Sequence, residues 1–438
     1  MNVTSDDKVP LGVTASLSTA LVGQNIIFAL QLNFLLFAFT DILGLMPAAV
    51  GTLLLVARLF DAANDPLMGY ITDSTRTRWG KYRPWLVVAP LPLGILSVLL
   101  FYNPGLGATE TLIYAYVVYF AWTLVYTLTD IPLWSMTATI TRNDTERARI
   151  VVIIRILAFV GALAPSILVP VIATSVAPES KETGYFIAVL AMVVVAVPML
   201  FAAFFGVREK VQPAREKATI GQVFGLLFSN KPLLLLMMNT ILSFMVLAGN
   251  SAMPFFAEYL LGDASLTGAL MAVSVGGMVA GMAFTPLLAR RFGKKETIIV
   301  TAFIRAGLLG AFFIIGFNDL WPVFGLLFVS GLLSGPNAAL TPVMIGDTID
   351  HMEKTKGNRS EGIAFAAFTF SNKTTTGLAA WFMGMILAMT GYVANQPQTV
   401  EAQEGIFWMV TLLPAFSSLA STIPLFFYKL ERSEPVPN

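Results

Sequence analysis

The amino-acid sequence predicts an all-α membrane protein with twelve transmembrane helices. Composition is the first observation: 56% of the 438 residues are hydrophobic and 12% are charged, whereas soluble domains are about half apolar and a quarter charged. Mean hydropathy is correspondingly high, at +0.75. The other two observations are the recurrence of long apolar runs and the segregation of Lys and Arg into alternate loops.

Each predicted span is an apolar run of about 20 residues or more, the length that an α-helix needs to cross a hydrocarbon core. Short polar segments separate these runs along the whole chain. The predicted spans are residues 12–39, 43–70, 84–103, 111–139, 150–176, 184–206, 232–260, 266–289, 296–317, 320–345, 361–391 and 404–428.

The basic residues predict the orientation, because Lys and Arg are retained in cytoplasmic loops. Of the 27 Lys and Arg residues, Lys181 alone falls in the second set of alternate loops, and four lie inside predicted spans: Arg58, Arg155, Arg305 and Lys373. All others lie in the first set of loops or near the chain ends. We therefore expect a multi-pass protein of the cell inner membrane with both termini cytoplasmic.

A short repeat divides the chain into two groups of six spans. The sequence RWGK at 78–81 returns as RFGK at 291–294, each time after the second span of its group. This repeat predicts an N-terminal half at 1–206, a charged cytoplasmic linker at 207–231 and a C-terminal half at 232–438. Two related halves of six spans indicate a secondary transporter with its site near the membrane midplane.

Several enzyme classes have no support in the sequence. It contains no GxxxxGK phosphate loop, no HExxH zinc motif and no GxSxG nucleophile motif, which are the local signatures of ATP use, zinc proteolysis and serine hydrolysis. The absence of cysteine also excludes disulfides and thiolate metal sites. We expect neither a bound cofactor nor a nucleic-acid partner.

The second predicted span carries charges where lipid is expected. Asp61, Asn64 and Asp65 share one helical face, with Arg58 one turn away. Exposing one such charge to lipid costs from about 2.5 kcal/mol upward, so this face must point into protein or water. Carboxylate and amide oxygens are ligands that hard cations prefer, which suggests a monovalent cation such as sodium. The alternative is that the acids only pair with Arg58 and Lys373 to hold helices together.

A second polar group lies in the fourth predicted span. Thr127, Asp130 and Trp134 share a helical face, and Arg155 is available on the next span. A carboxylate and a guanidinium beside an aromatic ring suit a sugar, because the charged groups bond its hydroxyls and the ring covers its apolar face. The alternative for Trp134 is simple packing.

Three stretches carry a family resemblance over essentially the whole chain. They are RLFDAANDPLMGYITDSTRTRWGKYRPW, YTLTDIPLWS and GDTIDHMEKTKGNRSEGIAFAAFTFSNK. Together they resemble the glycoside-pentoside-hexuronide:cation symporters of the major facilitator superfamily. The resemblance implies two six-helix bundles around a central cavity that opens alternately to either side.

The resemblance also implies roles for individual residues. The cation ligands would be Asp61, Asn64, Asp65 and Thr127, with Asp61 and Asp65 as the carboxylates that hold the coupling cation, for which we favour sodium. Lys373 would balance their charge, and we expect Arg58, one turn away on the same helix, to add to this balance. The sugar contacts would be Asp130, Trp134 and Arg155.

The first span departs from the melibiose-type carriers of this family. Where they place an acidic residue that holds galactosyl hydroxyls, and a lysine just before it, this chain has Asn25 and Gln24. We therefore expect Asn25 at a roomier and less anionic substrate site. Losing a negative charge near Arg155 would favour an acidic sugar such as a hexuronide glycoside.

The resemblance implies a gating role for residues of the loop after the second span: Asp73, Arg78, Lys81 and Arg83. From their position beside the other long cytoplasmic loop, we expect a matching gate formed by Asp347, Asp350, Arg359 and Glu361. Arg305 and Glu258 match no motif, and the sequence assigns them no role beyond pairing.

The sequence as a whole predicts a symporter, functional as a monomer, that couples sodium entry to uptake of a sugar or glycoside. Sodium is favoured over a proton because Asn64 and Thr127 add neutral oxygens that a proton does not need. One alternative is a lysolipid symporter with the same cation site. Another is an intramembrane aspartyl enzyme, which is disfavoured because acids one turn apart on one helix do not form a facing dyad.

Overall fold

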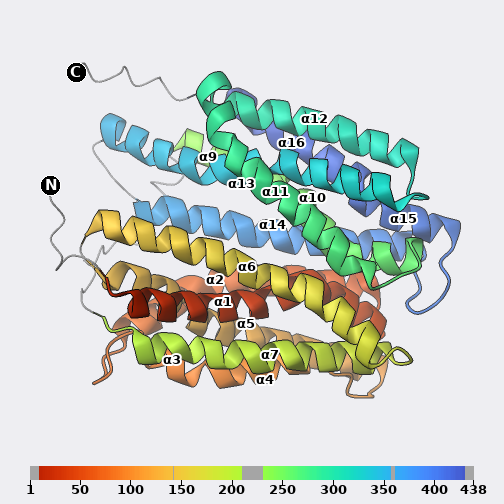
Figure 1. Cartoon of the computed structure of the whole chain (residues 1–438), viewed down its shortest axis with the longest axis horizontal. Coiled ribbons are helices and arrows are strands. Elements are labelled where there is room, and N and C mark those ends of the chain that lie inside the picture. The colour runs from red at the N-terminus through yellow and green to blue at the C-terminus, as the bar shows by residue number, and fades with distance from the viewer. Residues whose placement is uncertain (1–8, 142, 210–229, 357–360, 430–438) are drawn as a thin grey trace.

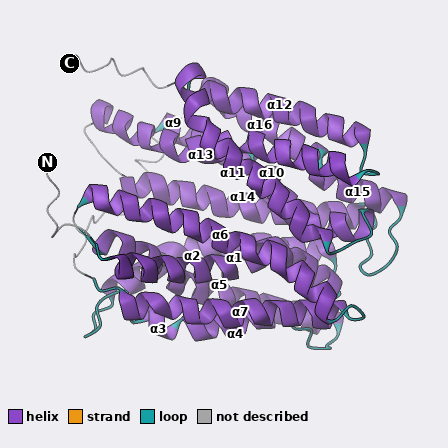
Figure 2. Cartoon of the chain, in the orientation of Figure 1, coloured by secondary structure: helices purple, strands orange, loops and turns teal. Residues whose placement is uncertain are grey.

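The computed structural model describes residues 9–141, 143–209, 230–356 and 361–429 (Figure 1). These residues form helices and connecting loops, and their only extended pairing is an isolated bridge between Thr77 and Gly80 (Figure 2). A helix satisfies its backbone polar groups internally, as a hydrocarbon environment requires. The predicted all-α fold is thus confirmed for the described residues.

The described residues of the N-terminal half form seven α-helices and one π-helical turn. They are α1 (Leu11–Phe37), η2 (Ala38–Ile42), α2 (Pro47–Ser74), α3 (Trp85–Val88), α4 (Pro90–Leu99), α5 (Ala108–Thr139), α6 (Asp144–Val176) and α7 (Lys181–Gly206). In Figure 1 they fill the lower part of the molecule.

The C-terminal half fills the upper part (Figure 1). Its described elements are α9 (Lys231–Leu242), α10 (Phe244–Phe255), η3 (Phe256–Leu260), α11 (Leu266–Phe292), α12 (Lys294–Ile315), α13 (Leu320–Lys356), α14 (Glu361–Met389), α15 (Val400–Val410) and α16 (Leu412–Phe427). Residues 210–229 of the predicted linker lie outside the described residues, and the domain boundaries stay a prediction.

Eight of the described helical segments are long and apolar enough to cross a membrane. The other predicted spans are 43–70, 84–103, 232–260 and 361–391. Two of these are divided into shorter helices, as at α4 and α9, whereas α2 and α14 are continuous but carry the charged residues of the candidate site. The total of twelve spans therefore remains a prediction.

The two halves pack closely at one end of the molecule. A Cβ on Gly384 of α14 would lie 2.3 Å from the Pro47 carbonyl oxygen of α2, and one on Gly268 of α11 would lie 2.9 Å from the Ile167 Cα of α6. Only glycine allows backbones to approach this closely. Both contacts lie toward the loops that are poor in Lys and Arg, the end that the sequence predicts to be external.

Candidate functional site

The polar face of α2 is buried within the protein. Pro47 occupies the first turn of this helix, where its missing N–H costs nothing, and the regular helix then places Arg58, Asp61 and Asn64 on one side. Asp61 is 1% exposed and Arg58 is 5% exposed. Since a buried charge needs a partner, the neighbours of these groups decide what the site can do.

Lys373 of α14 joins the two carboxylates of α2. Its Nζ lies 2.9 Å from Oδ2 of Asp61, and 2.7 and 2.6 Å from the two Oδ atoms of Asp65. The acids belong to the N-terminal half and the lysine to the C-terminal half. One ammonium therefore ties the halves together where the sequence predicts a cation.

The remaining predicted cation ligands lie beside this ion pair. The Thr127 hydroxyl of α5 donates to Oδ1 of Asp61 at 3.1 Å. Asn64 is buried, and its Nδ2 has no hydrogen-bond partner among the described residues. The structure thus brings all four predicted ligands to one place. The described residues contain no cluster of three or more His, Asp or Glu side chains that could hold a metal ion.

Arg58 connects the carboxylates to α1. Its Nη1 lies 3.6 Å from Oδ2 of Asp61, and its Nη2 donates to Oε1 of Gln31 at 2.6 Å. The guanidinium also lies 5.5 Å from the centroid of the Phe28 ring. Gln31 in turn donates to the Tyr119 hydroxyl of α5 at 2.5 Å. Two cations and two carboxylates therefore form a charge-balanced group, here called the acid–lysine network: Arg58, Asp61, Asp65 and Lys373.

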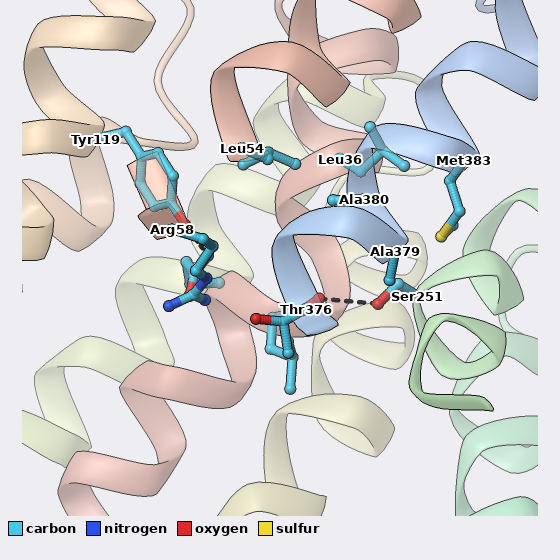
Figure 3. A pocket seen from close by; sticks show the side chains of 11 residues that line it. Leu36, Leu54, Arg58, Tyr119, Ser251, Thr376, Ala379, Ala380 and Met383 are labelled. Atoms are coloured by element: carbon cyan, nitrogen blue, oxygen red, sulfur yellow. Dashed lines mark hydrogen bonds between the residues drawn. The ribbon is translucent and has the colours of Figure 1, made fainter. Parts of the chain in front are cut away.

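A cavity of about 40 Å³ lies next to this network, between the halves (Figure 3). Its polar lining includes Gln31, Arg58, Tyr119, Ser251 and Thr376. The Ser251 hydroxyl of α10 donates to the Leu32 carbonyl of α1 at 3.0 Å, and this bond crosses between the halves. The volume has room for water but not for a sugar.

Gln24, rather than Asn25, reaches the predicted sugar residues. The Gln24 amide donates to Oδ1 of Asp130 at 2.8 Å and also to the Tyr126 hydroxyl. Asn25 instead donates to Oε1 of Gln24 at 2.7 Å and to the Leu21 carbonyl at 2.8 Å. Asn25 therefore lies behind Gln24 and touches Asp130 only through it.

Trp134 and Arg155 form the other side of this group. The Arg155 guanidinium lies 5.6 Å from the centroid of the Trp134 ring, a cation–π geometry. The Arg155 side chain is exposed, and no described carboxylate lies within salt-bridge distance of it. Its charge is available to a ligand.

A separate polar cluster joins the halves at the end predicted to be external. Asp41 of η2 accepts from the Tyr392 hydroxyl at 2.8 and 2.7 Å and from the Tyr259 hydroxyl. Lys181 pairs with Glu258 of η3 and lies 3.7 Å from Asp41. We call this group the outer cluster; its members are Asp41, Lys181, Glu258, Tyr259, Tyr392 and Asn395.

Asn395 and Tyr392 complete the outer cluster from the loop after α14. Asn395 donates to the Asp41 carbonyl at 2.7 Å and accepts from Lys181 at 2.7 Å. Burial, and then the charge of Asp41, raises the pKa of the Tyr392 phenol, so this hydroxyl stays a donor to Asp41 across physiological pH. Asp41 and Lys181 come from the N-terminal half and the other members from the C-terminal half. The cluster therefore closes this end.

The residues predicted for the first gate contact their own half and the start of the predicted linker. Arg83 donates from Nε and Nη2 to the Phe204 carbonyl of α7 at 3.1 and 2.6 Å. The Glu209 carboxylate accepts the backbone N–H groups of Lys81 and Tyr82 at 3.0 and 2.7 Å. Arg78 is exposed and lies against the Trp79 ring. The side chain of Asp73 lies outside the described residues.

The second predicted gate is described only in part. Asp347 of α13 accepts from Nζ of Lys294 of α12 at 2.9 and 2.6 Å, which is again a contact within one half. Asp350 is exposed at the end of α13. Arg359 and the side chain of Glu361 lie outside the described residues.

Sequence reasoning noted Gln24 but gave it no role, and it missed Gln31 and Asp41. The two glutamines are seven residues apart, which places them on one face of α1. Two polar side chains on one face of an apolar helix indicate a polar contact inside the protein, and this pattern could have identified them. Asp41 is an acid at the end of an apolar run. Glu258, without a sequence assignment, pairs with Lys181.

Comparison with known proteins shows the family of this chain. A family model described as MFS/sugar transport protein matches residues 17–432. The chain belongs to this family. It is 31% identical over 448 residues to the isoprimeverose transporter of Lactiplantibacillus pentosus, an alignment covering 99% of this chain and 92% of the relative. It is 29% identical over 412 residues to the glucuronide carrier protein homolog of Escherichia coli K12, covering 93% and 90%.

A solved structure with the same fold is the nucleoside transporter NupG, with a TM-score of 0.69 and 16% identity over 95% of this chain and 98% of NupG. These matches confirm the resemblance to the glycoside-pentoside-hexuronide:cation symporters of the major facilitator superfamily. The protein is a multi-pass membrane transporter and not an enzyme.

Proposed function

We propose that this MFS sugar transport protein is a symporter that couples sodium entry to uptake of a sugar or glycoside by alternating access. It acts as a monomer in the inner membrane with both termini cytoplasmic. The observation that carries the proposal is the Lys373 ammonium held between Asp61 and Asp65 beside Thr127. A place that satisfies one cation can receive another, and Asn64 and Thr127 offer the neutral oxygens that suit sodium.

Competition for the same oxygens gives the mechanism of coupling. The Lys373 ammonium bonds Oδ2 of Asp61 and both Oδ atoms of Asp65. A sodium ion bound at these oxygens therefore takes the place of the ammonium. Because Lys373 belongs to α14 and the acids to α2, cation binding releases a contact between the halves.

The closed outer end fits one state of alternating access. The outer cluster and the glycine contacts of α11 and α14 hold the halves together on the external side. On the cytoplasmic side, Arg83 and Asp347 bond within their own halves. This arrangement corresponds to a conformation closed to the outside, in which the site would exchange with the cytoplasm.

The substrate group fits an acidic sugar. Arg155 has no carboxylate partner among the described residues, whereas Asp130 is held by the neutral amide of Gln24. A guanidinium forms strong two-point hydrogen bonds with a carboxylate. We propose a glycoside that carries a uronic acid, in keeping with a relative named as a glucuronide carrier homolog.

The test is uptake into membrane vesicles, with sodium replaced by choline at fixed pH. A labelled glucuronide and a neutral glycoside serve as substrates. We expect sodium to stimulate accumulation of the glucuronide, and unchanged uptake in choline would remove sodium from the mechanism. If a proton gradient alone drives accumulation in choline, the coupling ion is a proton.

A second measurement, the effect of membrane potential on uptake, gives the net charge transported with each substrate. Sodium with a monoanionic glucuronide carries no net charge, whereas sodium with a neutral glycoside carries one, worth about 2.3 kcal/mol per 100 mV of membrane potential. An imposed negative-inside potential should therefore stimulate neutral uptake and leave glucuronide uptake unchanged. Preference for the neutral glycoside would reject the acidic substrate.

A further inference from the structure

Arg305 is a buried cation without a counter-charge among the described residues. It lies in the middle of α12 and is 8% exposed. Its Nε donates to the Ser330 hydroxyl of α13 at 3.1 Å, and its Nη1 donates to the Ser418 hydroxyl of α16 at 2.9 Å. No carboxylate of the described residues lies within 4.0 Å of the guanidinium. Buried charges are normally paired, so this arginine calls for an explanation.

A polar cavity lies against this guanidinium. Its volume is about 20 Å³, enough for one particle the size of a water molecule or a small ion. Its polar lining is Thr301, Arg305, Ser334, Asn337, Ser418 and Ser421. The helices that contribute these residues, α12, α13 and α16, belong to the C-terminal half.

The free hydrogen-bond donors at this cavity suit an anion. Ser334, Ser418 and Ser421 donate their hydroxyl hydrogens to backbone carbonyls of their own helices. An arginine has five N–H donors, and the bonds of Arg305 to Ser330 and Ser418 use two of them. The amide oxygen of Asn337 accepts from Thr341 at 2.9 Å, which fixes the side chain and leaves its NH₂ group to donate. Beside the hydroxyl oxygens, the cavity therefore presents the N–H donors of Arg305 and Asn337 and no carboxylate among its lining residues.

We propose that this cavity is a binding site for a small monovalent inorganic anion such as chloride, held by Arg305 and Asn337. The anion neutralises the guanidinium and ties α12, α13 and α16 together inside the C-terminal half. The site is separate from the acid–lysine network and from the proposed sugar residues. It can therefore exist whether or not the protein couples sodium to sugar uptake.

The test is thermal unfolding of the purified, detergent-solubilised protein at constant sodium concentration. Chloride is compared with methanesulfonate, an anion too large for the cavity, so that any cation effect is held fixed. We expect chloride to raise the melting temperature saturably, by roughly 2 °C or more. Equal melting temperatures in the two salts would overturn the proposal.

Variants locate the effect. Arg305→Gln should abolish the chloride-dependent shift, whereas Arg291→Gln, at an exposed arginine of α11, should retain it. If Arg305→Gln does not fold, Asn337→Ala provides the second measurement and should raise the half-saturating chloride concentration about tenfold. A full shift at unchanged chloride concentration in either variant would show that the anion acts elsewhere and contradict the proposal.

Bromide gives a direct readout that does not depend on stability or uptake. Crystals grown or soaked in bromide should show an anomalous scattering peak between Arg305 and Asn337. Peaks at other positions only would reject the site even if chloride stabilised the protein.

Discussion

Arg58 and Arg305 are two buried arginines with opposite surroundings. Their exposed fractions are similar, 5% and 8%. Arg58 lies among charged groups, beside Asp61 and in the same network as Asp65 and Lys373. Arg305 is bonded only to serine hydroxyls within the described residues. Equal burial therefore does not imply an equal role, because the surrounding charge decides which ion each site can accept.

The two arginines also differ in what they connect. The acid–lysine network crosses between α2 and α14, so a change in its charge acts on the contact between the halves. Arg305 joins helices of one half, so an ion there changes the stability of that half without opening or closing the molecule. This contrast yields the following predictions.

The largest effect is expected when a carboxylate is removed from the acid–lysine network, so that its buried cations lack a full counter-charge, as Arg305 does. Asp61→Asn leaves Arg58 and Lys373 facing Asp65 alone, and breaking a buried ion pair costs about 3 to 5 kcal/mol. We expect loss of sodium-stimulated sugar accumulation and a lower melting temperature. Vesicle uptake and thermal unfolding measure the two effects.

A charge-balanced double variant separates them. Asp61→Asn with Lys373→Gln leaves one cation and one carboxylate, so thermal stability should recover while sodium-stimulated accumulation stays absent. Sodium-dependent accumulation as in the unmodified protein, in either variant, would return the acids to a purely structural role.

The next prediction compares the arginines directly. Arg58→Gln should lower the melting temperature with or without chloride, because it leaves two carboxylates to share Lys373. Arg305→Gln should lower it in chloride, where the anion loses its partner, and raise it without chloride, where an unpaired buried charge is removed. The second effect is expected to be about 1 kcal/mol. Both proteins are measured by thermal unfolding, and the same sign for Arg305→Gln in both salts would break the comparison.

A variant of the outer cluster tests whether polar contacts between the two halves keep the external side closed. Asp41→Asn weakens its contacts with Tyr259, Tyr392 and Lys181 and should favour opening to the outside. Ser251 lines the cavity next to the acid–lysine network. Because the chain has no cysteine, Ser251→Cys provides a single thiol there, and its reaction with a membrane-impermeant maleimide reports access from outside. We expect Asp41→Asn to raise the labelling rate about tenfold, the equivalent of 1.4 kcal/mol.

Glu182→Gln is the matched control for this labelling experiment. Glu182 is the exposed neighbour of Lys181 and does not contact Asp41. Its neutralisation should leave the labelling rate unchanged. Equal rates for Asp41→Asn and Glu182→Gln would show that the outer cluster does not hold the external side closed.

Helix periodicity groups Asp61, Asn64 and Asp65 on one face whatever the tertiary fold, so this group could be predicted from the sequence. Pairing of the acids with Arg58 and Lys373 was the alternative to a cation site. The family resemblance placed Thr127 and Lys373, which lie on other helices, beside the acids. The outer cluster could not be predicted in this way. Its members come from the ends of separate helices and a loop, and only the packing of the two halves brings them together.

The first helix shows a different limit of sequence reasoning. Helix α1 is buried around most of its circumference, so no apolar stripe fixes its rotation, and neighbouring polar residues cannot be ranked by pattern. Alignment to a related motif favoured Asn25, whereas the structure places Gln24 against Asp130.

The smallest predicted effect tests whether Gln24 or Asn25 supports Asp130. It also tests whether this residue is independent of the acid–lysine network. Gln24→Leu removes the amide that donates to the half-buried Asp130. A hydrogen bond to a charged group contributes about 1.5 to 3 kcal/mol, so KM for the sugar should rise about tenfold with the half-saturating sodium concentration unchanged. Asn25→Leu, whose contacts are with Gln24 and the backbone, should change KM about twofold or less. Initial uptake rates over a range of sugar and sodium concentrations distinguish the two variants. A larger effect at Asn25 would mean that Asp130 is positioned by something other than the amide of Gln24. If Gln24→Leu instead changes the sodium dependence, the sugar residues and the acid–lysine network are coupled. The connection would then run along one face of α1, from Gln24 to Gln31, which bonds Arg58.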